Sequence, residues 1–154
     1  QTLIQRSSYQ EGFNYLEKIE KEFGEGRSKD DQKRINLLKA EVLQSTGKNS
    51  RAKELLAEVV SLHPLEGRAL IQLGQLAWKG NDLEYAIIQF ERAAQIDEFE
   101  NRALIEHARL LVFMGKYEDA ADLLEKAISI KPEKRVEKYL NAVNNLTLSA
   151  RKKL

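Results

Sequence analysis

Histidine, cysteine and paired carboxylates form most catalytic and metal sites, and this sequence places few of them at useful spacings. It contains two histidines, His63 and His107, and no cysteine. The lack of cysteine excludes disulfides, thiolate nucleophiles and thiolate metal ligands, and it leaves the compartment open because reducing and oxidising environments both tolerate such a chain. Neither histidine has Asp or Glu partners at the spacings that zinc sites use. We therefore expect no metal site.

The acidic pairs and the glycines also have structural explanations. Asp30-Asp31 and Asp97-Glu98 stand where helices are expected to begin, and negative charge at those positions complements the helix dipole. Gly24-Glu25-Gly26 lacks the rest of a dinucleotide-binding fingerprint. Because no nucleophile and base can be assembled, we expect no catalytic residues, no cofactor and no enzymatic activity.

Composition argues against two further classes. Lys and Arg total 25 against 24 for Asp and Glu, so the formal charge is +1 and no basic surface for nucleic acid is expected. The terminal Arg151-Lys152-Lys153 is explained as a helix end that complements the dipole. The longest apolar runs, such as Leu110 to Met114, are too short to cross a bilayer, so we expect a chain that is not embedded in a membrane.

The sequence does contain a repeat. Three similar segments end in Ala52, Ala86 and Ala120, which lie 34 residues apart. Other sets of equivalent positions, called columns below, keep the same 34-residue step: Ala40, Gly74 and Ala108; Leu37, Ile71 and Ile105; Leu56, Phe90 and Leu124; Val59, Ala93 and Ala127; Leu62, Ile96 and Ile130. A period that holds over this many columns indicates tandem structural units.

Each unit is predicted to be two helices joined by a short turn. Stripes of small and apolar residues at helical spacing mark both helices of the middle unit: Leu70, Leu73, Gly74 and Ala77 in the first, and Ala86, Phe90, Ala93 and Ile96 in the second. Ser50 and Asp82 are the expected N-caps of second helices. Pro64 and Pro132 cannot continue a helix and mark the exits of the first and third units.

The small residues indicate where the two helices of a pair meet. We expect Gly74 to face Ala86, with Phe90 filling the gap beside them, because only minimal side chains let two helix backbones approach closely. One such pair cannot bury its own apolar face, so it must stack on a neighbour.

These columns resemble the tetratricopeptide repeat family, whose signature combines Leu-Gly, Ala, an aromatic residue, Ala and Pro at a 34-residue period. The resemblance covers three repeats, at 33–66, 67–100 and 101–134. It implies an all-α fold, a right-handed α-solenoid of antiparallel helix pairs.

Four positions depart from the family pattern. The middle repeat has Glu98 in place of proline, and the third has His107 in a column that normally packs, where we expect a structural role. The first repeat has Asn36 and Lys39 at positions that are apolar in the family, which predicts a looser first helix.

Residues 1–30 are predicted to be a partial N-terminal unit and linker. Ser8 and Glu11 have capping-box spacing for a helix over 8–23, and Gly12, Leu16 and Ile19 would then occupy the columns of a second helix. Leu3 and Ile4 would belong to the tail of a preceding helix. The chain is then either part of a longer array or begins with a natural cap, and both alternatives stay open.

Residues 135–154 are predicted to be an amphipathic capping helix, which would close the last hairpin. Its packed side is expected to hold Val136, Tyr139, Leu140, Val143 and Leu146, and its wet side Asn141, Asn144 and Asn145.

In the tetratricopeptide family the first helices line a concave face, and the resemblance therefore implies a binding surface there. The candidate residues are Arg34, Leu37, Glu41, Arg68, Ile71, Gln75, Trp78, Arg102, Ile105, Arg109, Val112 and Phe113. Arg34, Arg68 and Arg102 recur at the repeat period, with pairing to Glu66 and Glu100 as the alternative to ligand binding. Packing between first helices is the alternative for Trp78.

The family's carboxylate clamp, which captures chaperone C-termini, is absent. Its columns require Lys and Asn in the opening repeat, Asn in the next and a basic residue in the third. In this sequence the first repeat has Leu37 and Glu41 at these positions, the second has Gln72, and the third has Glu106.

We therefore expect a protein–protein interaction scaffold that binds a peptide or helical segment of a partner in its concave groove, without catalysis. Two alternatives stay open, a homo-oligomeric assembly module that self-associates and an accessory domain of a larger multidomain protein.

Overall fold

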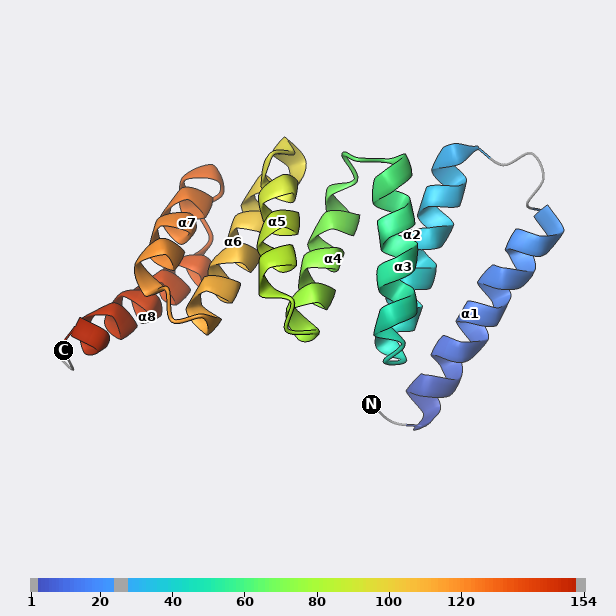
Figure 1. Ribbon diagram of the computed structural model, residues 1–154, viewed down its shortest axis with the longest axis horizontal. Coiled ribbons are helices and arrows are strands. Elements are labelled where there is room, and N and C mark those ends of the chain that lie inside the picture. Colours follow the sequence, from blue (N-terminus) through green and yellow to red (C-terminus); the bar gives the residue numbers. More distant parts are fainter. Residues whose placement is uncertain (1–2, 24–27, 152–154) are drawn as a thin grey trace. The chain divides into compact units, whose positions relative to one another are not determined.

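The computed structural model describes residues 3–23 and 28–151, and all regular structure within them is α-helical (Figure 1). The helices are α1 (Leu3–Phe23), α2 (Lys29–Ser45), α3 (Asn49–Leu62), α4 (Gly67–Lys79), α5 (Leu83–Ala94), α6 (Asp97–Phe113), α7 (Tyr117–Ile130) and α8 (Lys134–Arg151). The chain divides into two compact units, residues 1–69 and 70–154, and the division falls inside α4. The all-α prediction is confirmed.

In the unit of residues 1–69, α2 pairs with α3 and α1 packs against α2. α2 begins after Ser28, whose Oγ accepts a hydrogen bond from the amide of Asp31 at 3.1 Å. Ala40 and Ala52, two members of the small-residue columns, are fully buried. The α2–α3 turn passes through Gly47, whose φ of 79° lies in the left-handed region that favours glycine.

The two polar residues of α2 are both buried and both have partners. Asn36 accepts a hydrogen bond from Nε2 of Gln32 at 3.1 Å. The ammonium of Lys39 lies 5.8 Å from the centroid of the Phe13 ring, and the guanidinium of Arg51 lies 5.4 Å from the same centroid. Cation–π attraction and an apolar stem let a lysine replace a core residue here.

α1 is one continuous helix from Leu3, so two predictions about this segment are wrong. Ser8 lies inside the helix and not at its start, and Leu3 and Ile4 belong to α1 instead of a preceding helix. No proline interrupts the segment, and a serine within a helix costs less than about 0.7 kcal/mol relative to alanine. Among the described side chains of α1, Phe13 is the buried one. The predicted linker falls largely on residues 24–27, which lie outside the described residues.

In the unit of residues 70–154, a close contact joins α4 and α5. A Cβ atom added to Gly74 would lie 2.5 Å from the nearest ring carbon of Phe90, which is itself fully buried. The Phe90 ring therefore fills the space beside Gly74, as predicted. Ala86 is fully buried as well, and its position opposite Gly74 stays a prediction.

One of the two predicted N-caps is confirmed. Oδ1 of Asp82 accepts a hydrogen bond from the amide of Tyr85 at 3.3 Å, which satisfies one free donor at the start of α5. Ser50 is not a cap, because α3 already begins at Asn49 and Lys48 holds the cap position without a side-chain hydrogen bond.

The missing proline of the middle repeat changes where the next helix begins. α4 starts three residues after Pro64, and α8 starts two residues after Pro132. α6 starts at Asp97, directly after Ile96, because Glu98 leaves the backbone free to be helical. Acidic residues in this first turn complement the helix dipole, as predicted.

α8 packs against the α6–α7 pair. Val136 and Val143 are buried in one cluster with Ala108, Leu111, Ala120, Ala121 and Leu124. Leu146, predicted on the packed side, is 42% exposed. It lies about 60° around the helix from Val143, at the edge of the buried stripe. The three asparagines of the wet side are exposed.

Candidate functional site

The three periodic arginines, Arg34, Arg68 and Arg102, are all exposed. Arg68 forms an ion pair with Glu41 of α2. Within the residues that the structure describes, Arg34 and Arg102 have no ion-pair or hydrogen-bond partner on the side chain. Their charge is therefore available to a ligand.

The alternative that these arginines pair with Glu66 and Glu100 is not what the structure shows. Lys33 Nζ lies 3.4 Å from a carboxylate oxygen of Glu66, and Lys126 Nζ lies 2.9 Å from one of Glu100. Lysines thus neutralise both carboxylates.

The other candidate residues divide by exposure. Arg109 and Phe113 are exposed, and Glu41, Gln75, Trp78, Ile105 and Val112 are half-buried. Leu37 and Ile71 are buried, at 5% and 0% exposure, and present no surface to a ligand. A helix in a repeat array is covered by more than its own partner, so its buried arc is wider than the single stripe used in the sequence analysis.

Two aromatic side chains of this set contact each other. The ring centroids of Trp78, at the end of α4, and Phe113, at the end of α6, lie 5.7 Å apart with the planes tilted by 58°. Such a tilted arrangement is favourable for aromatic pairs. Phe113 nevertheless remains 62% exposed. Trp78 therefore packs against a neighbouring first helix, which was the alternative to ligand binding. The Phe113 ring of the pair still exposes aromatic surface.

A cavity of about 750 Å³ lies beside α6 and brings together three of the candidates, Arg102, Ile105 and Arg109. The rest of its lining comes from α6, from the α7–α8 turn and from the start of α8: Asn101, Glu106, Lys131, Glu133, Arg135, Val136 and Tyr139. Asn101 Nδ2 donates to the carbonyl of Ala127 at 2.7 Å, which ties this end of α6 to the end of α7. The volume is that of a typical ligand site.

The α8 side of this cavity was not predicted from the sequence. Val136 and Tyr139 were expected on the packed side of a cap, and no role was expected for Lys131 or Arg135. The available signal was the placement of Arg135 and Tyr139 four residues apart, on one face of the predicted helix.

Inside the cavity the carboxylates are more covered than the cations. The side chain of Glu106 is 13% exposed and its partner Arg109, at 3.3 Å, is 56% exposed. Glu133 is 26% exposed and pairs with Lys131 at 3.1 Å and Arg135 at 3.3 Å, both largely exposed. Lys131, with a smaller contribution from Arg135, holds the pKa of Glu133 below its ordinary value, so the carboxylate stays ionised. Positive charge therefore faces the solvent.

Tyr139 is half-buried in the wall of the same cavity. Burial raises the pKa of its phenol above the ordinary value; the Glu106 carboxylate adds to the rise and Arg109 opposes it. The hydroxyl therefore remains protonated at neutral pH and is able to donate a hydrogen bond.

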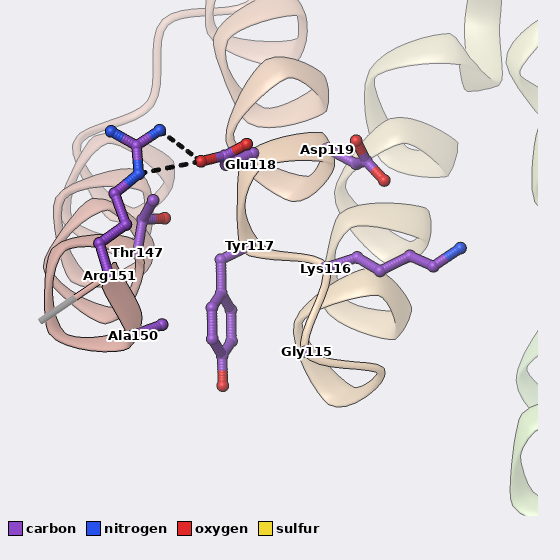
Figure 2. Close-up of a pocket in the computed structure, with 8 residues that line it drawn as sticks. All are labelled: Gly115, Lys116, Tyr117, Glu118, Asp119, Thr147, Ala150 and Arg151. Atoms are coloured by element: carbon purple, nitrogen blue, oxygen red, sulfur yellow. Dashed lines mark hydrogen bonds and ion pairs between the residues drawn. The ribbon is translucent and has the colours of Figure 1, made fainter. Parts of the chain in front are cut away.

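A smaller cavity of about 340 Å³ lies where α7 begins and α8 ends (Figure 2). Arg151 reaches toward Glu118 and pairs with it, with Nε 3.2 Å from Oε1, while Lys116 extends away from both. The guanidinium is thus already neutralised, and this cavity presents less open charge than the one beside α6.

The histidines occupy structural positions. The His107 ring lies 6.4 Å from that of Phe90, and burial lowers the pKa of His107 below its ordinary value, opposed by Glu91. His63 follows the last residue of α3. Across residues 3–23 and 28–151, no three His, Asp or Glu side chains gather as metal ligands would.

Models of the tetratricopeptide repeat match residues 37–101 and 102–134, which together make up more than half of the chain. The chain belongs to the tetratricopeptide repeat family. Repeats of this family typically act as non-catalytic scaffolds for protein–protein interaction. In the described part of this tetratricopeptide protein, no helix is long and apolar enough to span a bilayer.

One curated relative and several solved structures resemble this tetratricopeptide chain. Cellulose synthase operon protein C of Pseudomonas fluorescens (strain SBW25) is 30% identical over 92 residues, which are 60% of this chain and 7% of that protein. The chain therefore spans only a small part of that relative's length.

Among solved structures, MamA superposes with a TM-score of 0.73 at 19% identity, covering 93% of this chain and 75% of that one. MamA (41-end) from Desulfovibrio magneticus RS-1 gives 0.74 at 17% identity, covering 97% and 81%. YrrB, described as a TPR protein with an unusual peptide-binding site, gives 0.70 at 20% identity, covering 90% and 69%. At these identities the likeness is one of fold, an all-α solenoid.

Proposed function

We propose that this chain is a non-catalytic scaffold that holds a peptide or helical segment of a partner protein against the face of its first helices. The observation that carries this proposal is the Trp78–Phe113 pair. Two large aromatic rings meet on neighbouring first helices, and one of them is left mostly in water. Exposed aromatic surface of this kind is typical of the anchors that dominate protein interfaces.

The charges around the aromatic pair support the same face. Arg102 and Arg109 are exposed on α6, the helix that ends at Phe113. Exposed charges mainly increase association rates and their salt sensitivity, whereas a buried aromatic anchor governs dissociation. A partner segment with acidic and apolar residues would use both.

Site-specific photo-cross-linking tests this proposal. A benzoylphenylalanine at position 113 keeps an aromatic ring on the first-helix face, and the same probe at Ile88, a half-exposed position on the second helix α5, is the matched control. In extracts of the source cells we expect partner adducts from position 113 and few from position 88. Equal adducts from both positions, or adducts from position 88 alone, would contradict the proposal.

Kinetic measurements on a captured partner separate the two kinds of contact. Trp78→Ala should mainly shorten the lifetime of the complex, and Arg102→Glu should mainly slow its formation and flatten the salt dependence. Arg68→Glu is a poorer test, because it would place a second carboxylate beside Glu41. Unchanged association and dissociation rates in both variants would place the functional surface elsewhere.

Self-association is a second candidate, favoured by one observation. Leu146 and Leu148, near the end of α8, are 42% and 56% exposed. Light scattering over a concentration series tests it: a mass that doubles, and that returns to the monomer in Leu148→Glu, would support assembly through α8. An accessory role within a larger protein is compatible with either candidate, since the curated relative is far longer than this chain.

A further inference from the structure

We propose that the cavity between α6 and α8 is a binding site for an acidic side chain of an extended partner segment, and that α8 supplies half of it instead of serving only as a cap. This inference rests on the proposed function and narrows it to one site and one ligand chemistry. Three observations carry it: the position of α8, the open charge of Arg102, and the mixed lining of the cavity.

α8 occupies the place of a first helix. Its buried residues Val136 and Val143 lie 33 residues after Ala103 and Leu110, which are fully buried in α6. Arg135 likewise lies 33 residues after Arg102. The arginine column therefore continues into α8, one residue short of the 34-residue period. Two successive first-type helices thus bound the cavity: α6 supplies Arg102 and Arg109, and α8 supplies Arg135.

Charge in the cavity is arranged to receive an anion. Four cationic side chains and two carboxylates line it, an excess of two positive charges. Glu106 and Glu133 are already paired, and they are more covered than the cations that pair with them. Arg102 has no side-chain partner among the described residues and is exposed. An exposed guanidinium without a partner is able to donate a charge-assisted hydrogen bond to the carboxylate of a ligand.

The remaining lining favours a peptide over a nucleic acid. Ile105 and Val136 provide apolar surface, and the Tyr139 hydroxyl remains a donor. The carboxylates of Glu106 and Glu133 are able to accept hydrogen bonds from peptide N–H groups, and they would repel a phosphodiester backbone. A carboxylate flanked by amide groups and an apolar side chain matches this combination. Regularly spaced phosphates do not.

The test uses the full chain, ¹⁵N-labelled, titrated with blocked peptides and followed by amide shifts. The probe is Ac-Gly-Asp-Leu-Asp-Gly-NH₂, and its uncharged twin has Asn in place of both Asp residues. We expect the acidic probe to shift amides of α6 and α8 around the cavity and to bind about tenfold more tightly than its twin, the effect of one charge-assisted hydrogen bond.

Matched variants assign the effect to the site. Arg102→Gln should weaken the acidic probe about tenfold and leave its twin unchanged. Arg92→Gln, the same substitution at an exposed arginine of α5 outside the cavity, should change neither. Tyr139→Phe should weaken the acidic probe two- to threefold while retaining the ring and the fold. Raising the salt concentration should weaken only the acidic probe.

Several results would overturn the inference. Equal affinity of the two blocked peptides, or no loss in Arg102→Gln, would show that the cavity does not recognise acidic side chains. Tighter binding of the Asn twin with a free C-terminus would mean that the cavity recognises a chain end. Tighter binding of a short DNA duplex would mean that it is a nucleic-acid site. The proposed function is judged separately, because adducts from position 113 do not require the α6–α8 cavity.

Discussion

Gly74→Ala is expected to destabilise this chain even though it replaces a helical glycine by the best helix former. The new Cβ atom would lie 2.5, 2.8 and 2.9 Å from three ring carbons of Phe90, which is fully buried. Overpacking typically costs about 1–3 kcal/mol, and contacts this short place the cost near 3. Alanine regains about 1 kcal/mol of helix propensity. The net loss is about 2 kcal/mol.

Thermal and urea unfolding followed by circular dichroism measure this loss. For a chain of this length, about 2 kcal/mol lowers the melting temperature by roughly 4–8 °C. Gly12→Ala is the matched control, because nothing lies within 4 Å of the Cβ position at Gly12. It should stabilise the unit of residues 1–69 by about 0.5–1 kcal/mol, through helix propensity alone.

A double-mutant cycle assigns the effect to the ring. In a Phe90→Leu background the obstructing ring carbons are gone, so Gly74→Ala should become neutral or stabilising. The two substitutions should therefore couple by about 2–3 kcal/mol. Gly74→Ala with unchanged or raised stability in the parent, or the same loss in both backgrounds, would refute this account of the contact. Gly74→Leu should be more destabilising than Gly74→Ala.

Three further predictions concern other parts of the chain. Deleting residues 135–154 should produce dimers or aggregates in light scattering, because the cluster under α8 becomes exposed; a monomer of unchanged stability would contradict this. Burial depresses the pKa of His107, so the stability that its neutral form contributes is present above its unfolded pKa, about 6.5, and is lost as the pH falls through the lower folded value. Urea titrations at several pH values should show that loss in the parent and not in His107→Leu. Phe13→Leu should destabilise by about 1–2 kcal/mol, because it removes the ring that faces Lys39 and Arg51; in Lys39→Met the same substitution should cost less.

The fold was largely predictable from the sequence because its determinants are local. The step between Ala40, Gly74 and Ala108 indicated the repeat, and Asp82 and Pro132 marked turns that the structure contains. Errors arose where a local signal was ambiguous. Ser8 looked like a cap only because a capping box is defined by spacing, and the same two residues fit inside a helix.

The candidate surface was less predictable. Spacing on a helix tells which residues share a face, but not which neighbouring helices cover that face. Leu37 and Ile71 were therefore assigned to a surface and are buried. Lys39 looked like a defect in the core because its partner, Phe13, is on another helix. Neither the partner of Arg68 nor the freedom of Arg102 could be deduced from the period.

The sequence by itself determined the period, the helix pairs, the small-residue columns and the family. Each of these depends on contacts between residues within about one repeat of each other, and such contacts recur along the chain as a pattern. Only the tertiary structure decided how closely the Phe90 ring approaches Gly74, that α8 joins α6 around a cavity, and that the cations of this cavity face the solvent while its carboxylates are covered. These features depend on how side chains from different helices meet, and a cavity forms where those side chains leave space unfilled. No spacing within a single helix encodes that.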